Sequence, residues 1–315
     1  SLLIYVNDSL ANDKNWSDLN ISKISKSYSI ILDEAHKWCS DNKLDFLERN
    51  VLDSKKEMLS LTAKLHKGNT GSPRIYKAIE GSKKADIFGL FEAITEGSDG
   101  CSNRILKPYD YHIHLIKVDI SKDERTVRKK LLADSINKSI KLISEDKGIP
   151  TIVYVKSADS DKENGAPAVA GRIADEAEVT CQDYIGNRTS AMKTRRRKLF
   201  NKGDLEVLVA VRCLDEGVNI PRIQRLMLTH GSLDDERQWI QRRGRALRID
   251  PEFPENPEIH DFLPVPSDLK TEDINFDSVN LIKRHYRKVI ELADLSQRSF
   301  GLKEYKQIMT EVEQW

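Results

Sequence analysis

Short apolar runs alternate along this chain with segments of helical periodicity, and this alternation limits the folds that it can adopt. TIVYV (151–155) is a continuous apolar run, which is typical of a strand buried on both faces of a parallel sheet, and LEVLVAV (205–211) is expected to be another strand. A helical pattern over 189–202 lies between them. The alternation predicts an α/β protein with a largely parallel sheet.

The same pattern extends over most of the sequence. Further strands are expected at 2–6, 28–32, 57–63, 111–120, 179–185 and 223–230, with 258–263 as the last strand. Helices are expected at 85–97, 122–147 and 234–244, and two amphipathic helices at 278–295 and 302–314 form the tail. We therefore predict two α/β domains and a helical C-terminal extension, which could dock on the second domain or bind a protein partner.

Composition narrows the class of protein. The chain has 315 residues, a length typical of two domains, and 39% hydrophobic with 32% charged residues indicates a soluble globular protein. The net charge of +1 means that a nucleic-acid partner would be met by local basic patches. No membrane-spanning run or signal peptide is visible, and four dispersed cysteines without a C-x-x-C pair fit a reducing cytoplasm. No metal spacing is recognised among the seven histidines, so His112 and His114 are interpreted as one strand face.

The string ILDEAHKW (31–38) places two adjacent carboxylates at the end of an apolar strand, which is a Walker B arrangement. Asp33 could hold Mg²⁺ through water at the carboxyl edge of the sheet, and Glu34 could polarise an attacking water. The alternative is that the two acids only cap the following helix. The complete D-E-A-H string favours catalysis.

Two other strand ends carry hydroxyl groups. Ser60 and Thr62 in LSLTAKL could hydrogen-bond the Walker B carboxylates, or they could be ordinary turn residues. In YVKSADS, Lys156 and Ser157 follow a buried strand and suit contacts with a phosphate backbone. Each pattern is weak when it is taken alone.

RTSAMKTRRRKLFNKGD (188–204) is a basic run that includes Arg188, Arg195 and Arg196. Such a run is typical either of a solvated helix face or of a surface that binds nucleic acid electrostatically. The sequence leaves both interpretations open.

Two strings in the last third of the chain are more specific. In VLVAVRCLDEGVNIP (207–221), Gly217 allows close approach of a ligand, and Glu216 and Asn219 offer acceptors for ribose hydroxyls. QWIQRRGRALR (238–248) contains the spaced pattern Q-x-x-G-R-x-x-R, formed by Gln241, Gly244, Arg245 and Arg248. Arg242 and Arg243 fall outside it and are left for packing, acidic partners or phosphate backbone.

In this order, the strings resemble the motor core of superfamily 2 helicases and translocases. ILDEAHK looks like motif II, LSLTAKL like motif III, TIVYVKSAD like motif IV, VAVRCLDEGVNIP like motif V, and QWIQRRGRALR like motif VI. LFEAITEG with LKPYDYHIHLIKVD, and LDEGVNIP with IQRRGRALR, resemble the DEAH-box branch of XPB-type repair helicases and type I and III restriction motor subunits. The resemblance implies two RecA-like domains, the first incomplete at 1–106 and the second at 107–265, with a helical extension at 266–315.

The resemblance also implies roles for the matched residues. Asp33 would organise Mg²⁺ and Glu34 would position the hydrolytic water, while His36, Ser60 and Thr62 would couple the ATP site to nucleic acid. Glu216 and Gly217 would touch ribose or nucleic acid. Gln241, Arg245 and Arg248 would face the γ-phosphate, with the two arginines as arginine fingers, which contribute about 10³–10⁵ in rate where tested. ATP and Mg²⁺ are the implied cofactors.

Two departures from the family pattern qualify this expectation. The P-loop G-x-x-x-x-G-K-[ST] does not occur in the sequence, so we expect it in a preceding part of a longer protein and expect the chain alone to be inactive. Asn219 stands where motif V often has aspartate. The leading hypothesis is an ATP-dependent DNA helicase or translocase in repair, restriction or anti-phage defence. A non-catalytic nucleic-acid-binding scaffold and an RNA-directed motor are the alternatives.

Overall fold

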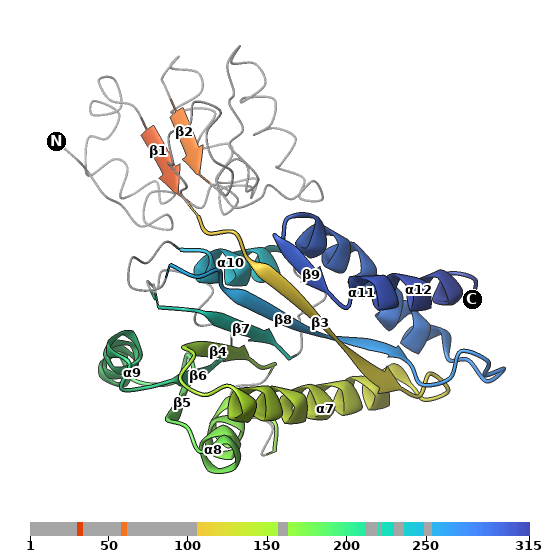
Figure 1. Ribbon diagram of the computed structural model, residues 1–315, viewed down its shortest axis with the longest axis horizontal. Helices are drawn as coiled ribbons and strands as arrows, with labels where there is room; N and C mark the ends of the chain where they lie inside the picture. The colour runs from red at the N-terminus through yellow and green to blue at the C-terminus, as the bar shows by residue number, and fades with distance from the viewer. Residues whose placement is uncertain are drawn as a thin grey trace, which may run out of the picture. The chain divides into compact units, whose positions relative to one another are not determined.

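A computed structural model describes residues 30–33, 58–61, 106–156, 163–211, 220, 222–229, 236–248 and 254–315 (Figure 1). The chain divides into two compact units, Ser1–Phe88 and Gly89–Trp315. The described part of the first unit is a parallel pair of strands, β1 (Ile30–Asp33) and β2 (Met58–Leu61). Both strands lie where the sequence predicts them.

The second unit contains a seven-stranded sheet in the order β5-β6-β4-β7-β8-β3-β9, in which every neighbouring pair is parallel. This confirms the predicted α/β architecture. The strands are β3 (Asp110–Val118), β4 (Thr151–Tyr154), β5 (Cys181–Tyr184), β6 (Val207–Ala210), β7 (Arg225–Leu228), β8 (Glu258–Pro266) and β9 (Arg298–Phe300).

Helices cover both faces of this sheet (Figure 1). Tyr154, Leu228 and Asp261 are register partners, so their side chains point to one face. Helices α10 and α11 lie on that face, because Arg242 contacts Tyr154 and Lys288 contacts Asp261. Helices α7 and α8 pack together on the other face. The helices are α7 (Glu124–Glu145), α8 (Ala166–Ala177), α9 (Ser190–Lys202), α10 (Glu236–Ala246), α11 (Phe276–Asp294) and α12 (Leu302–Val312).

Local signals in the sequence explain where these helices begin and end. The Asp123 carboxylate accepts a hydrogen bond from the Thr126 amide at the start of α7, and Thr189 caps α9 through the Met192 amide. Gly203 ends α9 with a φ of 88°, a left-handed conformation that glycine adopts without strain. Helices α7, α9, α10, α11 and α12 lie within a few residues of their predicted ranges, and the helix expected at 85–97 lies outside the described residues.

The tail helices are part of the packed core. Lys288 of α11 donates to the buried Asp261 carboxylate at 2.9 Å, and the Tyr111 hydroxyl donates to the same carboxylate at 2.9 Å. Tyr305 of α12 is fully buried. Charge pairing and burial thus attach α11 and α12 to the sheet, in agreement with the docking alternative for the C-terminal extension.

One strand was not predicted. β9 lies between the two tail helices and pairs with β3, so 258–263 is not the last strand of the chain. Its three residues, Arg298–Phe300, are too few to show the alternation by which a strand is recognised in a sequence. The domain boundaries at 106 and 265 stay predictions. None of the described helices combines the length and apolar composition that a membrane-crossing segment needs.

Candidate nucleotide and nucleic-acid site

Arg242, Arg243 and Arg245 on α10, together with Arg248 just after it, separate into two pairs. Arg242 and Arg243 are 4% and 3% exposed. The guanidinium carbon of Arg242 lies 4.4 Å from the centre of the Tyr154 ring, and that of Arg243 lies 5.1 Å from the centre of the Trp239 ring. These are cation–π contacts in a desolvated setting, where such contacts are strongest. Of the alternatives left open for this pair, packing is what the structure shows.

Arg245, in the last turn of α10, and Arg248, two residues beyond the helix, are only half-buried. Partial burial, and then the charge of Arg245, lower the pKa of Arg248. Both side chains are partly exposed, and a guanidinium group binds phosphate through two parallel N–H donors.

The end of α10 is tied to the segment before β3. The Lys107 amide donates to the Leu247 carbonyl at 2.7 Å, and Leu106 and Arg248 form an isolated antiparallel bridge. The backbone at Arg248 is therefore held against the segment that precedes β3. Gly244 lies in the middle of α10, and a side chain added there would meet no described atom within 4 Å. Gln241 also lies on α10, and its side chain is outside the described part.

The carboxyl end of β4 meets α10 and the end of β7. The Thr229 hydroxyl donates to the carbonyl of the buried Tyr154 at 2.7 Å. Lys156 follows two residues later and is exposed. The Tyr154 ring therefore contacts Arg242, and Lys156, a predicted phosphate contact, follows Tyr154 by two residues in the chain.

Asp183, at the end of β5, holds two of the predicted nucleic-acid-binding arginines. Arg188 donates from Nε and Nη2 to its two carboxylate oxygens at 3.0 Å, and Arg196 donates to Oδ1 at 2.5 Å. Both arginines thus anchor α9, whereas Arg195 is exposed. Asp183 was not among the predicted site residues. An acid five residues before Arg188 was the only local signal for it.

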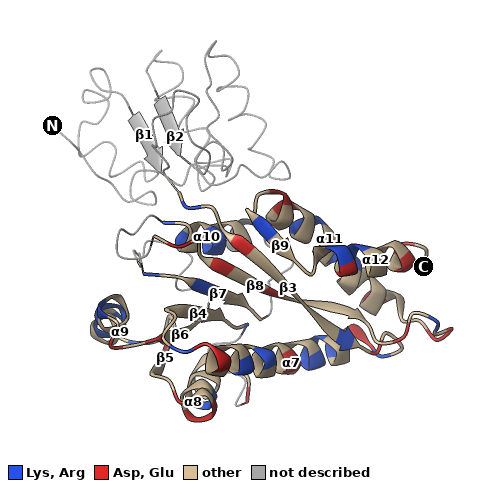
Figure 2. Ribbon diagram, viewed as in Figure 1, with Lys and Arg blue, Asp and Glu red and all other residues tan. Residues whose placement is uncertain are grey.

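A shallow depression of about 640 Å³ lies along α9, and its described lining is mostly hydroxyl and basic side chains. The blue segments on α9 show this basic character (Figure 2). Such donors suit phosphate oxygens, which do not report base sequence. The lining includes Ser190, Thr194, Arg195, Lys198 and Lys202.

In the first unit, the parallel register places Leu32 beside Ser60 and Asp33 beside Leu61. The strand end that carries Asp33 therefore lies next to the one that carries Ser60. The side chains of both residues are outside the described part. The remaining predicted site residues also lie outside it, namely Glu34, His36, Thr62, Ser157, Glu216, Gly217 and Asn219.

Comparison with known families agrees with this architecture. Residues 134–250 match the family model of the helicase conserved C-terminal domain. The second unit has the RecA-like fold of helicase C-terminal domains. No curated protein matches the sequence significantly.

Solved helicase structures share this fold at low sequence identity. A fragment of a putative HsdR subunit of a type I restriction enzyme from Vibrio vulnificus YJ016 has a TM-score of 0.53 at 16% identity, covering 79% of this chain and 46% of that one. Helicase Lhr from Mycobacterium smegmatis, bound to ssDNA and AMP-PNP, has a TM-score of 0.51 at 14% identity, covering 93% and 34%. S. cerevisiae Dbp5, bound to RNA and ADP BeF3, has a TM-score of 0.50 at 14% identity, covering 95% and 67%. The chain thus spans between about a third and two thirds of these relatives.

Proposed function

We propose that this chain is the second lobe, with part of the first, of an ATP-dependent superfamily 2 helicase or translocase that moves on nucleic acid. The helicase C-terminal domain match supports a helicase-type function. The single observation that carries the proposal is the difference in burial between two pairs of arginines. Arg242 and Arg243 are buried and pack against aromatic rings, while Arg245 and Arg248 are half-buried and have the three-residue spacing of motif VI.

Arg245 and Arg248 are proposed to act on the γ-phosphate of ATP. Their guanidinium groups present paired N–H donors, which match the oxygens of a polyphosphate. When bound, ATP supplies the phosphoryl group whose transfer to water drives movement. The contribution of this chain is two guanidinium groups at the end of α10, a helix held on the sheet by the contacts of Arg242 with Tyr154 and of Arg243 with Tyr109. Rigid support of this kind lowers the reorganisation needed to stabilise developing charge.

The roles of the other site residues follow from their motifs. We assign Mg²⁺ coordination through water to Asp33, water activation to Glu34, and phosphate contact to Gln241. Coupling between ATP and nucleic acid is assigned to His36, Ser60, Thr62, Glu216, Gly217 and Asn219, and Gly244 belongs to the motif that carries the arginines. These assignments rest on sequence and on the pairing of β1 with β2.

Nucleic acid is proposed to bind along the exposed groups at the end of β4 and on α9. Lys156 and Arg195 are exposed, and Arg188 and Arg196 hold α9 in place for them. Contacts of this kind bind phosphate, so affinity should fall steeply with salt. DNA is proposed as the track. The DEAH-box strings and the fold shared with the HsdR fragment support placement in the restriction and XPB-type branch.

The decisive experiment measures nucleic-acid-stimulated ATP hydrolysis by the full-length gene product. Arg245→Ala and Glu34→Gln are each expected to lower the stimulated rate by about 10³-fold or more. Lys306→Ala, an exposed change on α12, is the control and should leave it unchanged. Hydrolysis that survives Arg245→Ala would overturn the mechanism.

Two further outcomes separate the alternatives. Salt-sensitive binding of nucleic acid without any hydrolysis would identify a scaffold. Competition between single-stranded DNA and RNA of the same sequence distinguishes a DNA motor from an RNA motor, and preferential binding and stimulation by RNA would refute the choice of DNA.

A further inference from the structure

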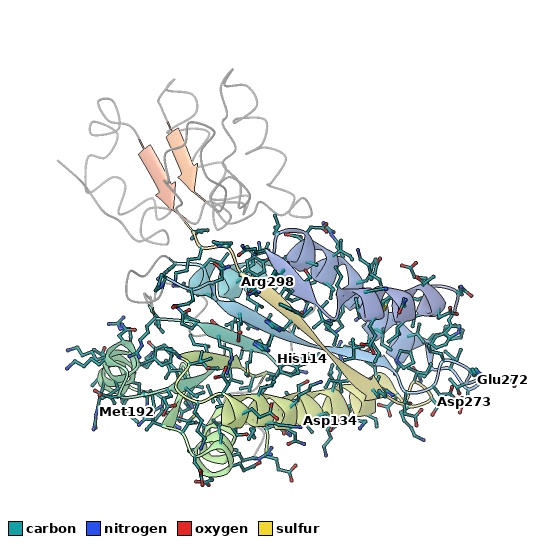
Figure 3. All side chains as sticks on the ribbon, viewed as in Figure 1. His114, Asp134, Met192, Glu272, Asp273 and Arg298 are labelled. Atoms are coloured by element: carbon teal, nitrogen blue, oxygen red, sulfur yellow. The ribbon has the colours of Figure 1, made fainter. Side chains whose placement is uncertain are left out.

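A stack of aromatic rings crosses β9, β3 and β8 on the sheet face opposite Tyr154. The His112 ring lies between those of Phe300 and His260, with centroid distances of 4.5 and 4.6 Å. His114 stacks on His260 at 5.1 Å and on Phe262 at 4.9 Å. Figure 3 labels His114 of this stack and Arg298, whose guanidinium carbon lies 5.6 Å from the centre of the Phe300 ring.

The strand register brings a third kind of side chain to the stack. His112 and His260 are direct partners on adjacent parallel strands, and Glu258 precedes His260 by two residues on the same face. One nitrogen from each of the two histidines and one oxygen of Glu258 all lie within 4.8 Å of one another. Two histidines and a carboxylate on neighbouring strands form a set of donors that proteins use for zinc.

Hydrogen bonds fix the orientation of His260 and Glu258. His260 Nδ1 lies 2.9 Å from His114 Nε2, and His260 Nε2 lies 3.1 Å from Glu258 Oε2. Arg225 donates from Nε to the same oxygen at 3.1 Å, leaving the second oxygen of Glu258 without a hydrogen bond from these two partners. Metal-binding residues are commonly oriented by such outer partners.

The surroundings also set the protonation state that a cation needs. Burial, and then the neighbouring His260, lower the pKa of His112 to about 4. The His260 hydrogen bond, followed by the Arg225 charge, lowers the pKa of Glu258 to about 2 against the effect of burial. Neutral imidazole and ionised carboxylate are the forms in which these groups bind a cation.

We propose that His112, Glu258 and His260 form a binding site for a divalent transition metal of the zinc class, with water completing the coordination. His260 would bind through Nε2 as the Nδ1–H tautomer, donating its proton to His114 Nε2. His112 turns about its side-chain bonds on binding, because the two rings are now 7° from parallel and a cation lies in the plane of each ring that binds it. Nitrogen donors favour Zn²⁺, Co²⁺ or Ni²⁺ over Mg²⁺ and Ca²⁺.

This site is independent of the proposed motor function. It lies on the opposite face of the sheet from Tyr154 and Arg242, and it joins β8 to β3 near their amino-terminal ends. A cation there would cross-link residues that are 148 positions apart in the sequence, from 112 to 260. Its expected effect is stabilisation of the domain, since a ligand that binds only the folded state raises stability by mass action.

The test uses the chain with any affinity tag removed and with metals stripped by chelator. Titration with Co²⁺ is expected to give the visible d–d bands of a four- or five-coordinate nitrogen and oxygen site, at one ion per chain. Zn²⁺ should displace the Co²⁺ and raise the melting temperature. His112→Gln and His260→Gln are each expected to abolish the bands and the thermal shift.

Phe300→Leu is the matched control, because it removes a ring from the stack without removing a donor, and it should retain binding. Circular dichroism of each variant establishes that it is folded, and the half-buried His112 is the safer of the two substitutions. No Co²⁺ spectrum at micromolar protein, cobalt–thiolate charge-transfer bands, or binding that survives His112→Gln in a folded protein would each overturn the proposal.

Discussion

The central guanidinium carbon of Arg242 lies 4.4 Å from the centre of the Tyr154 ring. Both side chains are buried, and they join the helix of motif VI to the strand that precedes Lys156. A shift of α10 would therefore act, through this contact, on the carboxyl end of β4.

Removal of the Tyr154 ring should destabilise the domain. Tyr154→Leu is expected to lower the free energy of unfolding by about 2 kcal/mol, because it loses the cation–π contact and leaves space in the core. Tyr154→Phe keeps the ring and should lose much less. Urea denaturation measures both variants. Equal losses for the two would show that the ring contact with Arg242 contributes nothing.

The Asp183 carboxylate is expected to stabilise α9. Asp183→Asn leaves two arginines without their shared charge partner and should cost about 1–3 kcal/mol, with faster amide exchange in α9. Asp134→Asn breaks an exposed i,i+4 pair with Lys130 and should cost less than about 0.5 kcal/mol. Losses of the same size would mean that the Asp183 cluster behaves as an ordinary surface ion pair.

Lys288 should be more important for stability than other lysines of the tail. Lys288→Met leaves the Asp261 carboxylate, which is fully buried, without its cation, and we expect a loss of about 3–5 kcal/mol. Lys306→Met on the exposed side of α12 is the control. Thermal unfolding followed by circular dichroism compares them. If Lys288→Met unfolded like the control, the ion pair would not be what attaches α11 to the sheet.

Stability should fall in strongly alkaline solution. Burial raises the pKa of the Tyr305 hydroxyl well above 10 and that of Tyr109 to about 12. The unfolded chain loses these protons first, so the folded state loses stability as the pH rises through about 10. The change is measured by urea denaturation between pH 8 and 11.

Tyr305→Phe isolates one part of this effect. The Tyr305 hydroxyl is buried and has no hydrogen-bond partner within the described residues, so its removal should not lower stability at neutral pH. The variant should instead show a shallower alkaline decline than the wild type. An unchanged slope would contradict the role of Tyr305.

Local pattern was sufficient to predict most of this fold. The apolar run at 151–155 became β4, and the periodicity over 122–147 became α7, because each depends on residues that are close in sequence. The motif VI spacing likewise separated Arg245 and Arg248 from the arginines that pack. These features need no knowledge of which strands are neighbours.

Long-range pairing could not be predicted in the same way. Asp183 forms ion pairs with two arginines of a basic run that, in sequence alone, resembles a solvated helix face. Strand β9 is too short to show an alternating pattern. The group of His112, Glu258 and His260 exists only because β3 pairs with β8 in one register. A shift of one residue would move His260 to the other face of the sheet.

The pairing of β9 with β3 has a consequence for how this domain can be divided. Its three residues cover one side of β3 at the border of the sheet, and the Arg298 guanidinium binds the Asp110 carboxylate there. A truncated version ending after β8 would leave the first three residues of β3 with unsatisfied backbone groups on that side, which invite another chain to pair with them. Exchange of this domain between proteins, in the laboratory or in evolution, therefore has to include the segment through α12.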